Sequence, residues 1–342
     1  MKKFRVGLIG CGGISGAHIP VLMAMENIEI AAVADIRPER AQAAAEKTGA
    51  RVAPSWQDLI TYDDVDVVHV LTPHYLHAPM AIAALQAGKH VLTEKPMAST
   101  LEDARALIAA SQVNGAPNLG VIFQNRYNPA SVELKRIADS GEFGNVIGMR
   151  ASVTWHREAP YYTESGWRGA WSTEGGGVLI NQAIHTLDLL SYIGGPIVRV
   201  KGSVSTDRLR DAIEVEDNAH AVFDFENGAR GTIHVSNNYA TDAPVFIECL
   251  FENAVFQIIG DKLFRVIDGI PVLHLDGAKP STVSDKAYWG SGHPAQIHHY
   301  YECLERGEKF PIDGVSAYPA LALVKGIYTS SDTGEWVSLI EK

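Results

Sequence analysis

Short apolar runs alternate with amphipathic helical patterns over roughly the first 120 residues of the chain. Buried runs separated by helix-length segments are typical of a parallel sheet wrapped by helices. The apolar runs predict strands at Arg5–Ile9, Glu29–Ala34, Val65–Leu71, His90–Thr93 and Asn118–Phe123. The segments between them predict helices near Ile14–Met25, Pro38–Thr48, Trp56–Thr61, Tyr75–Ala87 and Leu101–Asn114.

Beyond about residue 145 the pattern changes to alternating and β-branched runs, several of them separated by hairpin signals. Strands are predicted at Val146–Thr154, Val198–Ser205, Ala219–Phe225, Ala229–Val235, Val245–Phe251 and Ala254–Ile259. Helices are predicted at Gly177–Ile193, Pro294–Glu305 and Ala317–Thr329. The fold class is therefore α/β. We expect a doubly wound Rossmann parallel sheet in residues 1–123. An α+β domain with an open, mostly antiparallel sheet should follow in residues 124–342.

Composition limits the partners. A chain of 342 residues favours two domains. The formal net charge of −11 argues against nucleic acid, because phosphate binding requires a basic surface. The three cysteines are too few and too scattered for a disulfide framework, and no run of about 18 apolar residues indicates a membrane span. We expect a cytoplasmic protein.

The first predicted strand leads into a glycine-rich turn with Gly10, Gly12 and Gly13, and Ile14 opens the next helix. Such a turn lets the backbone approach a pyrophosphate, and the helix N-terminus favours its negative charge. Asp35 closes the second strand 25 residues after Gly10, where a carboxylate accepts hydrogen bonds from a ribose. Asp35 favours NAD over NADP, whereas Arg37 keeps NADP possible. Ser15 replaces the third glycine of the motif and is small enough for that position.

Three further clusters follow predicted strands or open a helix. Thr72, Pro73, His74 and His77 come after the third of the long strands, and Glu94-Lys95-Pro96 follows His90–Thr93. The last cluster is a glycine run, Gly175-Gly176-Gly177, that leads into a helix. On that helix Asn181, His185 and Asp188 are spaced i, i+4 and i+7, so they share one face.

These motifs, in this order, resemble the glucose–fructose oxidoreductase/inositol dehydrogenase family, often called Gfo/Idh/MocA, over essentially the whole chain. The resemblance implies a Rossmann domain followed by a substrate domain whose sheet forms a homo-oligomer, a dimer or tetramer. It implies that Lys95 and His185 are catalytic. Many family members have Asp where this chain has Asn181. The resemblance also places Thr72, Pro73, His74, His77, Glu94 and Lys95 beside the cofactor.

The residue types suit alcohol oxidation. His185 is a suitable base because histidine titrates near pH 6.5 in water, about the working pH. Lys95 would stabilise charge on the reacting oxygen, and Asn181 would orient a substrate hydroxyl. His77 has an alternative role in capping its own helix.

An unusually aromatic segment, with arginines among the rings, suits the C–H patches and hydroxyls of a sugar. An ordinary packed loop is the alternative. The candidate substrate residues are Trp155, Arg157, Tyr161, Arg168 and His298. We expect no metal site, because neither His74 and His77 nor His293, His298 and His299 form a convincing ligand set.

The sequence thus predicts an NAD(P)-dependent enzyme that transfers a hydride between nicotinamide and a secondary hydroxyl of a sugar, polyol, inositol or sugar derivative. Two alternatives stay open. One is an NAD-dependent enzyme that cleaves glycosides with no net redox change. The other is a dinucleotide-binding sensor without catalysis.

Overall fold

The computed structural model describes residues 3–277 and 292–340. The described chain divides into two compact units. Unit 1 contains residues 3–123 and 293–318, and unit 2 contains residues 124–277, 292 and 319–340. Neither unit is one continuous stretch of chain, because most of helix α9 (Gly292–Arg306) and the start of α10 (Gly314–Thr333) belong to unit 1, after the main part of unit 2. Each unit is described by itself below.

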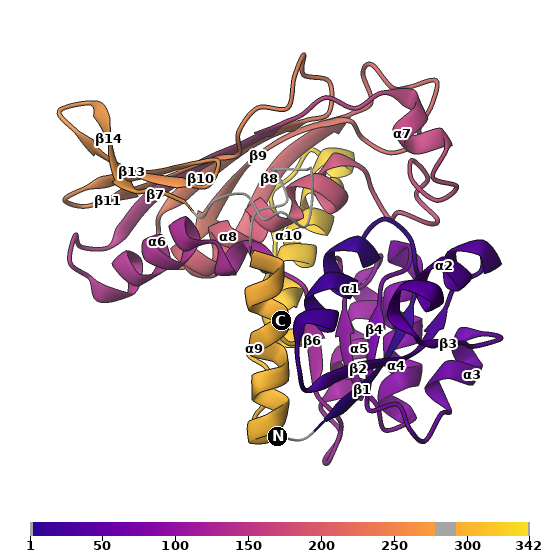
Figure 1. The fold of residues 1–342 in the computed structure, drawn as a ribbon. Coiled ribbons are helices and arrows are strands. Elements are labelled where there is room, and N and C mark those ends of the chain that lie inside the picture. Colours follow the sequence, from indigo (N-terminus) through magenta and orange to yellow (C-terminus); the bar gives the residue numbers. More distant parts are fainter. Residues whose placement is uncertain (1–2, 278–291, 341–342) are drawn as a thin grey trace. The chain divides into compact units, whose positions relative to one another are not determined.

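Unit 1 is built on a six-stranded sheet in the order β3-β2-β1-β4-β5-β6, with every pair parallel. Its strands are β1 (Phe4–Ile9), β2 (Ile28–Ala34), β3 (Arg51–Val52), β4 (Val67–Val70), β5 (His90–Thr93) and β6 (Leu119–Val121). Its crossover helices are α1 (Ser15–Ala24), α2 (Pro38–Thr48), α3 (Trp56–Ile60), α4 (His74–Gln86) and α5 (Leu101–Ser111). This strand order defines the doubly wound Rossmann fold and confirms the predicted class (Figure 1).

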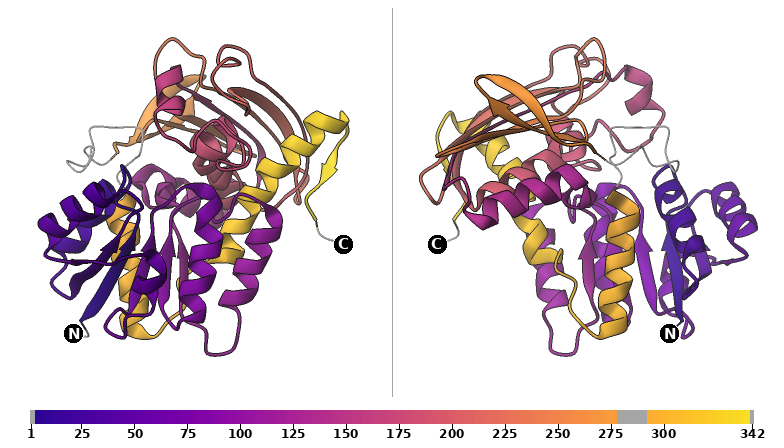
Figure 2. Two further views of the ribbon diagram at one scale, coloured as in Figure 1. Left: turned by 90° about the vertical axis from the view of Figure 1, so that its right-hand side faces the viewer. Right: turned by 60° about the vertical axis from the view of Figure 1, so that its left-hand side comes forward.

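Burial explains why the strands of unit 1 read as continuous apolar runs. Strand β4 is buried along its whole length, and β1 is buried except at Arg5. Helices lie on both faces of this sheet (Figure 2), so its central strands are covered on both faces, whereas both residues of the edge strand β3 are exposed. Side-chain caps start two of the helices: Ser55 accepts a hydrogen bond from Asp58 N, and Thr100 accepts one from Asp103 N.

Unit 2 is built on a nine-stranded sheet in the order β14-β13-β12-β11-β7-β10-β9-β8-β15. Of the described pairs, β7 and β10 are parallel and the others are antiparallel, as predicted for a mostly antiparallel sheet. The strands of this sheet include β7 (Val146–Thr154), β8 (Ile197–Ser205), β9 (Asn218–Phe225) and β10 (Arg230–Ser236). The remaining strands are β11 (Phe246–Phe251), β12 (Val255–Ile259), β13 (Lys262–Ile267), β14 (Ile270–Leu275) and β15 (Val337–Ser338).

The helical segments of unit 2 include elements that the hydrophobic pattern did not predict. These are the short 3₁₀ helix η1 (Gln124–Tyr127), α6 (Pro129–Ser140) and α7 (Ala159–Thr163). The predicted helix over Gly177–Ile193 is present as two pieces: a π-helical segment, η2 (Leu179–Ala183), runs directly into α8 (Ile184–Gly194). Single π-helical turns occur frequently at functional sites.

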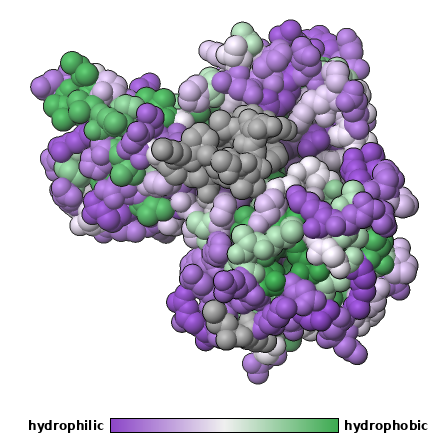
Figure 3. Space-filling model, viewed as in Figure 1, coloured by the Kyte–Doolittle hydropathy of each residue, from purple (hydrophilic) through white to green (hydrophobic). Residues whose placement is uncertain are grey.

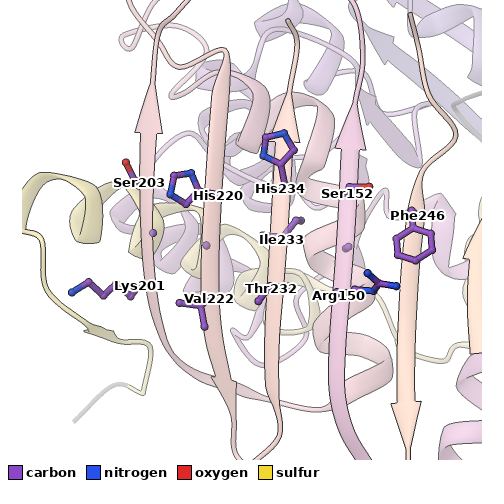
Figure 4. A pocket seen from close by; sticks show the side chains of 13 residues that line it. Arg150, Ser152, Lys201, Ser203, His220, Val222, Thr232, Ile233, His234 and Phe246 are labelled. Carbon is purple, nitrogen blue, oxygen red and sulfur yellow. The ribbon is translucent and has the colours of Figure 1, made fainter. Parts of the chain in front are cut away.

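One face of the unit 2 sheet carries a shallow cavity of about 670 Å³, shown in Figure 4. Side chains from five neighbouring strands line it, among them Arg150, Lys201, His220 and His234. The residues predicted to be catalytic or cofactor-binding are not among its lining residues.

Within the part of the chain that the structure describes, none of the helices combines the length and the apolar character needed to cross a bilayer. The three cysteines, Cys11, Cys249 and Cys303, are all free thiols.

Candidate active site

The glycine-rich turn follows β1 at the point where the strand order of the unit 1 sheet reverses. Strands β2 and β4 lie on opposite sides of β1, so the carboxyl ends of β1 and β4 flank the crevice in which open α/β sheets bind ligands. Gly10 has φ of 97°, and a Cβ on it would lie 2.5 Å from the carbonyl oxygen of Leu71 after β4. Only glycine fits here. At Gly13 no described atom lies within 4 Å of such a Cβ, which leaves that side of the turn open.

Asp35 is fixed against this turn by two backbone amides. Its Oδ2 accepts a hydrogen bond from Cys11 N at 2.7 Å, and its Oδ1 accepts one from Arg37 N at 2.8 Å. Each carboxylate oxygen keeps a second lone pair for a ribose hydroxyl. Arg37 is exposed, and Arg40 places Nη1 3.4 Å from where a Cβ on Gly12 would stand. Arg40 is a second cation near the turn that the sequence did not single out.

Ser15 fills the place of the third motif glycine. Its side chain is buried and its hydroxyl donates a hydrogen bond to the carbonyl oxygen of Gly12 at 2.7 Å. Ile14 precedes it as the residue before the first turn of α1. The serine therefore stabilises the turn that it closes.

The segment after β4 contains a buried hydroxyl group, Thr72 Oγ1, with no hydrogen-bond partner among the described residues. Pro73 stands immediately before α4, whose first residue, His74, is buried. His77 spans two carbonyl oxygens, with Nδ1 2.7 Å from Pro96 O and Nε2 2.7 Å from Thr72 O. His77 thus joins two predicted cofactor segments instead of capping its helix, and burial lowers its pKa.

These features fit a dinucleotide. The open glycine turn, the anchored carboxylate of Asp35 and the unsatisfied hydroxyl of Thr72 lie at the same end of the sheet. This is the edge at which Rossmann domains bind the pyrophosphate, ribose and nicotinamide.

The Glu94-Lys95-Pro96 turn follows β5 at the same edge. The carboxylate of Glu94 is buried, 3.0 Å from His18 Nε2, and its other oxygen accepts a hydrogen bond from Lys95 N at 3.3 Å. Burial by itself would raise the pKa of Glu94, but the neighbouring His18 and His293 hold it well below its ordinary value. Lys95 is partly exposed, and its peptide bond to Pro96 is cis. Glu94 therefore fixes the backbone from which the Lys95 side chain extends.

In unit 2, a buried carboxylate accepts hydrogen bonds from the backbone at the N-terminal end of the helical segment that carries His185. Glu216 accepts hydrogen bonds from Gly177 N at 2.8 Å and from Leu179 N at 2.9 Å, and from the hydroxyl of Tyr328 at 2.9 Å. A carboxylate at this position complements the helix dipole. A Cβ on Gly177 would lie 1.9 Å from Glu216 O, so the last glycine of the run is required by packing. Glu216 and Tyr328 carry no local signal in the sequence.

Asn181 lies in the π-helical segment and contacts Glu174, an acidic residue that was not among the predicted site residues. Its Nδ2 donates a hydrogen bond to Glu174 Oε1 at 2.5 Å, and Gly169 N donates one to Glu174 Oε2 at 2.6 Å. Burial raises the pKa of Glu174 to about 7. A carboxyl group that titrates near neutrality therefore stands beside Asn181, seven residues earlier in the chain.

His185 is the second residue of α8, four residues after Asn181. Its Nε2 lies 3.3 Å from the side-chain amide nitrogen of Gln124. A hydrogen bond donated by that amide requires a lone pair on Nε2, the form in which histidine accepts a proton. Asp188 forms a bidentate ion pair with Arg126, at 2.7 and 2.6 Å. The three residues of the predicted helix face thus have three different partners: Glu174, Gln124 and Arg126.

The predicted substrate residues fall into two groups. In unit 2, Arg168 lies over the ring of Tyr161 at 4.5 Å, and the Tyr161 hydroxyl accepts a hydrogen bond from Gln182, the neighbour of Asn181. Arg157 pairs with Asp242 at 2.9 Å. Trp155 is buried and donates from Nε1 to Ala243 O, a packing role. His298 is exposed on α9, which belongs to unit 1.

Comparison with known proteins agrees with this geometry. Residues 4–122 match the model of the Gfo/Idh/MocA oxidoreductase family, NAD-binding Rossmann fold, and residues 131–262 match the Gfo/Idh/MocA C-terminal domain. The chain belongs to this oxidoreductase family, and its first domain binds NAD.

Three relatives illustrate the family. The chain is 30% identical to levoglucosan dehydrogenase of Pseudarthrobacter phenanthrenivorans over 277 residues, 70% of this chain and 71% of that enzyme. It is 35% identical to inositol 2-dehydrogenase of Rubrobacter xylanophilus over 55% of this chain and 51% of that enzyme. Among solved structures, the WlbA dehydrogenase of Bordetella pertussis in complex with NADH and UDP-GlcNAcA has a TM-score of 0.87 and 31% identity, and the match covers 100% of both chains.

Proposed function

We propose that this protein oxidises a secondary hydroxyl of a sugar, inositol or sugar derivative with NAD. His185 accepts the hydroxyl proton and Lys95 stabilises negative charge on the reacting oxygen. When bound, NAD supplies the hydride acceptor. The observation that carries the proposal is the contact between His185 Nε2 and Gln124, because it is compatible with a neutral imidazole with a basic nitrogen.

The substrate class is supported by the relatives, which include levoglucosan, inositol and D-apiose dehydrogenases. The structure of unit 2 adds Tyr161, Arg157 and Arg168, an aromatic ring flanked by guanidinium groups. Such a group suits hydroxyl-rich or anionic sugars. The WlbA dehydrogenase complex contains a nucleotide sugar with a carboxylate, so substrates of that kind belong in the test.

A homo-oligomer formed through the unit 2 sheet is part of this proposal. The β13–β14 hairpin exposes four large apolar residues, Ile267, Ile270, Val272 and Leu273, and Figure 3 shows hydrophobic colour gathered on this hairpin. Contiguous apolar surface of this kind marks association sites in soluble proteins. We place the assembly in the cytoplasm.

The test is a panel of free sugars, inositols, polyols and uronic-acid nucleotide sugars, assayed for NADH absorbance with NAD and NADP. Lys95→Met and His185→Asn should lower turnover by roughly 10²–10⁴-fold while NAD affinity is preserved. A Lys95 variant that keeps wild-type turnover with tight NAD binding would contradict the assignment. Glycoside cleavage without net NADH would favour the glycoside-cleaving alternative, and no reaction across the panel would favour the sensor.

A further inference from the structure

Three buried side chains of unit 1, none of them assigned a chemical step in the proposed reaction, converge on one point. They are His18 on α1, Glu94 at the end of β5 and His293 in the first turn of α9, with exposed fractions of 0%, 4% and 6%. One ligand atom from each lies within 4.8 Å of the other two. No local sequence pattern indicates this cluster, because the three residues are far apart along the chain.

The spacing of the ligand atoms suits a small divalent cation. Glu94 Oε1 lies 3.0 Å from His18 Nε2 and 3.7 Å from His293 Nε2. Two ligands of a tetrahedral zinc ion with bonds of about 2.0–2.1 Å stand roughly 3.3–3.4 Å apart, and the two observed distances bracket that value.

His293 provides an independent observation. Its Nε2 is buried, points toward Glu94 at a distance beyond hydrogen-bond length, and has no hydrogen-bond partner among the described residues. Leaving a buried ring nitrogen unsatisfied is costly. A cation between His293 and Glu94 removes that cost.

The atoms behind these ligands form a second layer typical of a metal site. His18 Nδ1 lies 3.0 Å from His69 Nδ1, and His69 Nε2 lies 2.8 Å from the Tyr301 hydroxyl. With a cation on His18 Nε2, the proton of His18 resides on Nδ1 and is donated to His69, which donates in turn to Tyr301. Such a chain fixes the ring orientation and the tautomer of a metal ligand.

We propose that His18, Glu94 and His293 bind one zinc-like divalent cation, with a fourth position for water. Two histidines and a carboxylate are an established zinc ligand set. The cation joins α1, the end of β5 and α9, and it holds the backbone next to Lys95 from within unit 1. Its role is structural, so the proposal does not depend on the identity of the substrate.

The test uses the full-length protein without an affinity tag, stripped of metal and titrated with Zn²⁺ and Co²⁺. We expect one equivalent of Co²⁺ with the visible spectrum of a four-coordinate site, displaced by Zn²⁺. Metal analysis should find one Zn²⁺ per chain after dialysis, and the melting temperature should rise with Zn²⁺.

His293→Gln and Glu94→Gln should weaken binding by roughly 100-fold or more, because loss of a supporting residue alone costs 10–100-fold. His299→Gln, a substitution of another histidine on α9, is the matched control and should bind as wild type does. The proposal is overturned if the wild-type protein binds no stoichiometric Co²⁺ or Zn²⁺, or if His293→Gln binds as tightly as wild type. Should Glu94→Gln fail to fold, the wild-type spectrum and His293→Gln still decide.

Discussion

The side-chain amide of Asn181 donates a 2.5 Å hydrogen bond to Glu174. Many family members are expected to have an acid at position 181, and here an acid stands next to it instead. Glu174 has no exposed surface, and burial raises its pKa to about 7. The helical segment that carries His185 therefore has a titrating carboxyl group in contact with it at Asn181, which is four residues before the histidine.

The free energy of unfolding should change with pH as Glu174 titrates. The folded pKa of Glu174, about 7, exceeds its ordinary value of 4.5, so the folded state binds the proton more tightly than the unfolded state. This contribution to the free energy of unfolding is complete below pH 4.5 and is lost as pH rises to about 7. The loss amounts to up to about 3 kcal/mol. Glu174→Gln should remove that part of the pH dependence in urea unfolding between about pH 5 and pH 8.

The control for this measurement is Glu226→Gln, which changes an exposed glutamate of unit 2. It should keep the wild-type slope. If Glu174→Gln shows the same loss of stability with rising pH as wild type, Glu174 does not titrate in this range.

Gly177 is predicted to tolerate no side chain. Its Cβ would meet the backbone carbonyl of Glu216 at 1.9 Å, and backbone yields less than a side chain does. Gly177→Ala should destabilise unit 2 by about 1–3 kcal/mol and lower turnover, because the π-helical segment begins two residues later. Gly16→Ala is the comparison, since no described atom lies within 4 Å of that Cβ and the residue is in a helix. It should be neutral or stabilising by about 0.5–1 kcal/mol in thermal unfolding without cofactor.

The sequence predicts those helices and strands whose bounds are set by residues close together along the chain. Strand β5 and helix α2 have the predicted bounds because buried runs and terminal glycine or proline residues mark them locally. Helix α6 and the β13–β14 hairpin were not predicted. The hairpin's apolar residues are exposed, so the alternation that marks a half-buried strand is absent.

The same division applies to the site. The 3.6-residue period predicted that Asn181, His185 and Asp188 share one face of a helix. The structure places Asn181 in the π-helical segment η2 and the other two residues in α8, and the period indicated neither the π-helical turn nor any of the partners. Glu174 and Gln124 reach that helix from other segments, and Glu94 meets His18 from 76 residues away. Such contacts are set by tertiary packing. The functional roles of these residues stay predictions.

Cofactor choice should respond to Asp35. Its carboxylate repels a 2′-phosphate, whereas Arg37 and Arg40 supply positive charge near the turn. Asp35→Asn keeps the size of the side chain and should lower the ratio of kcat/KM for NAD to that for NADP by at least roughly tenfold, about 1.4 kcal/mol. Adding Arg40→Ala should reverse the gain with NADP. An unchanged ratio in Asp35→Asn would show that this carboxylate does not face the adenosine ribose.

Arg126 and Asp188 form a buried ion pair that ties η1 to α8 within unit 2. Asp188 is 2% exposed, and burial raises its pKa even with the guanidinium beside it. Arg126→Met leaves the carboxylate buried without that cation and should lower the free energy of unfolding by about 3 kcal/mol. Part of this cost is avoided at low pH, where Asp188 takes up a proton.

The double variant Arg126→Met/Asp188→Leu distinguishes the effect of the two charges from the effect of side-chain packing. It replaces two charges by apolar groups of similar volume and should regain most of the lost stability in urea unfolding. Turnover should be below that of wild type in both the single and the double variant, because the ion pair fixes η1, which also carries Gln124, the residue in contact with His185. Wild-type turnover in the double variant would mean that this pair contributes to folding alone and that the position of Gln124 does not depend on it.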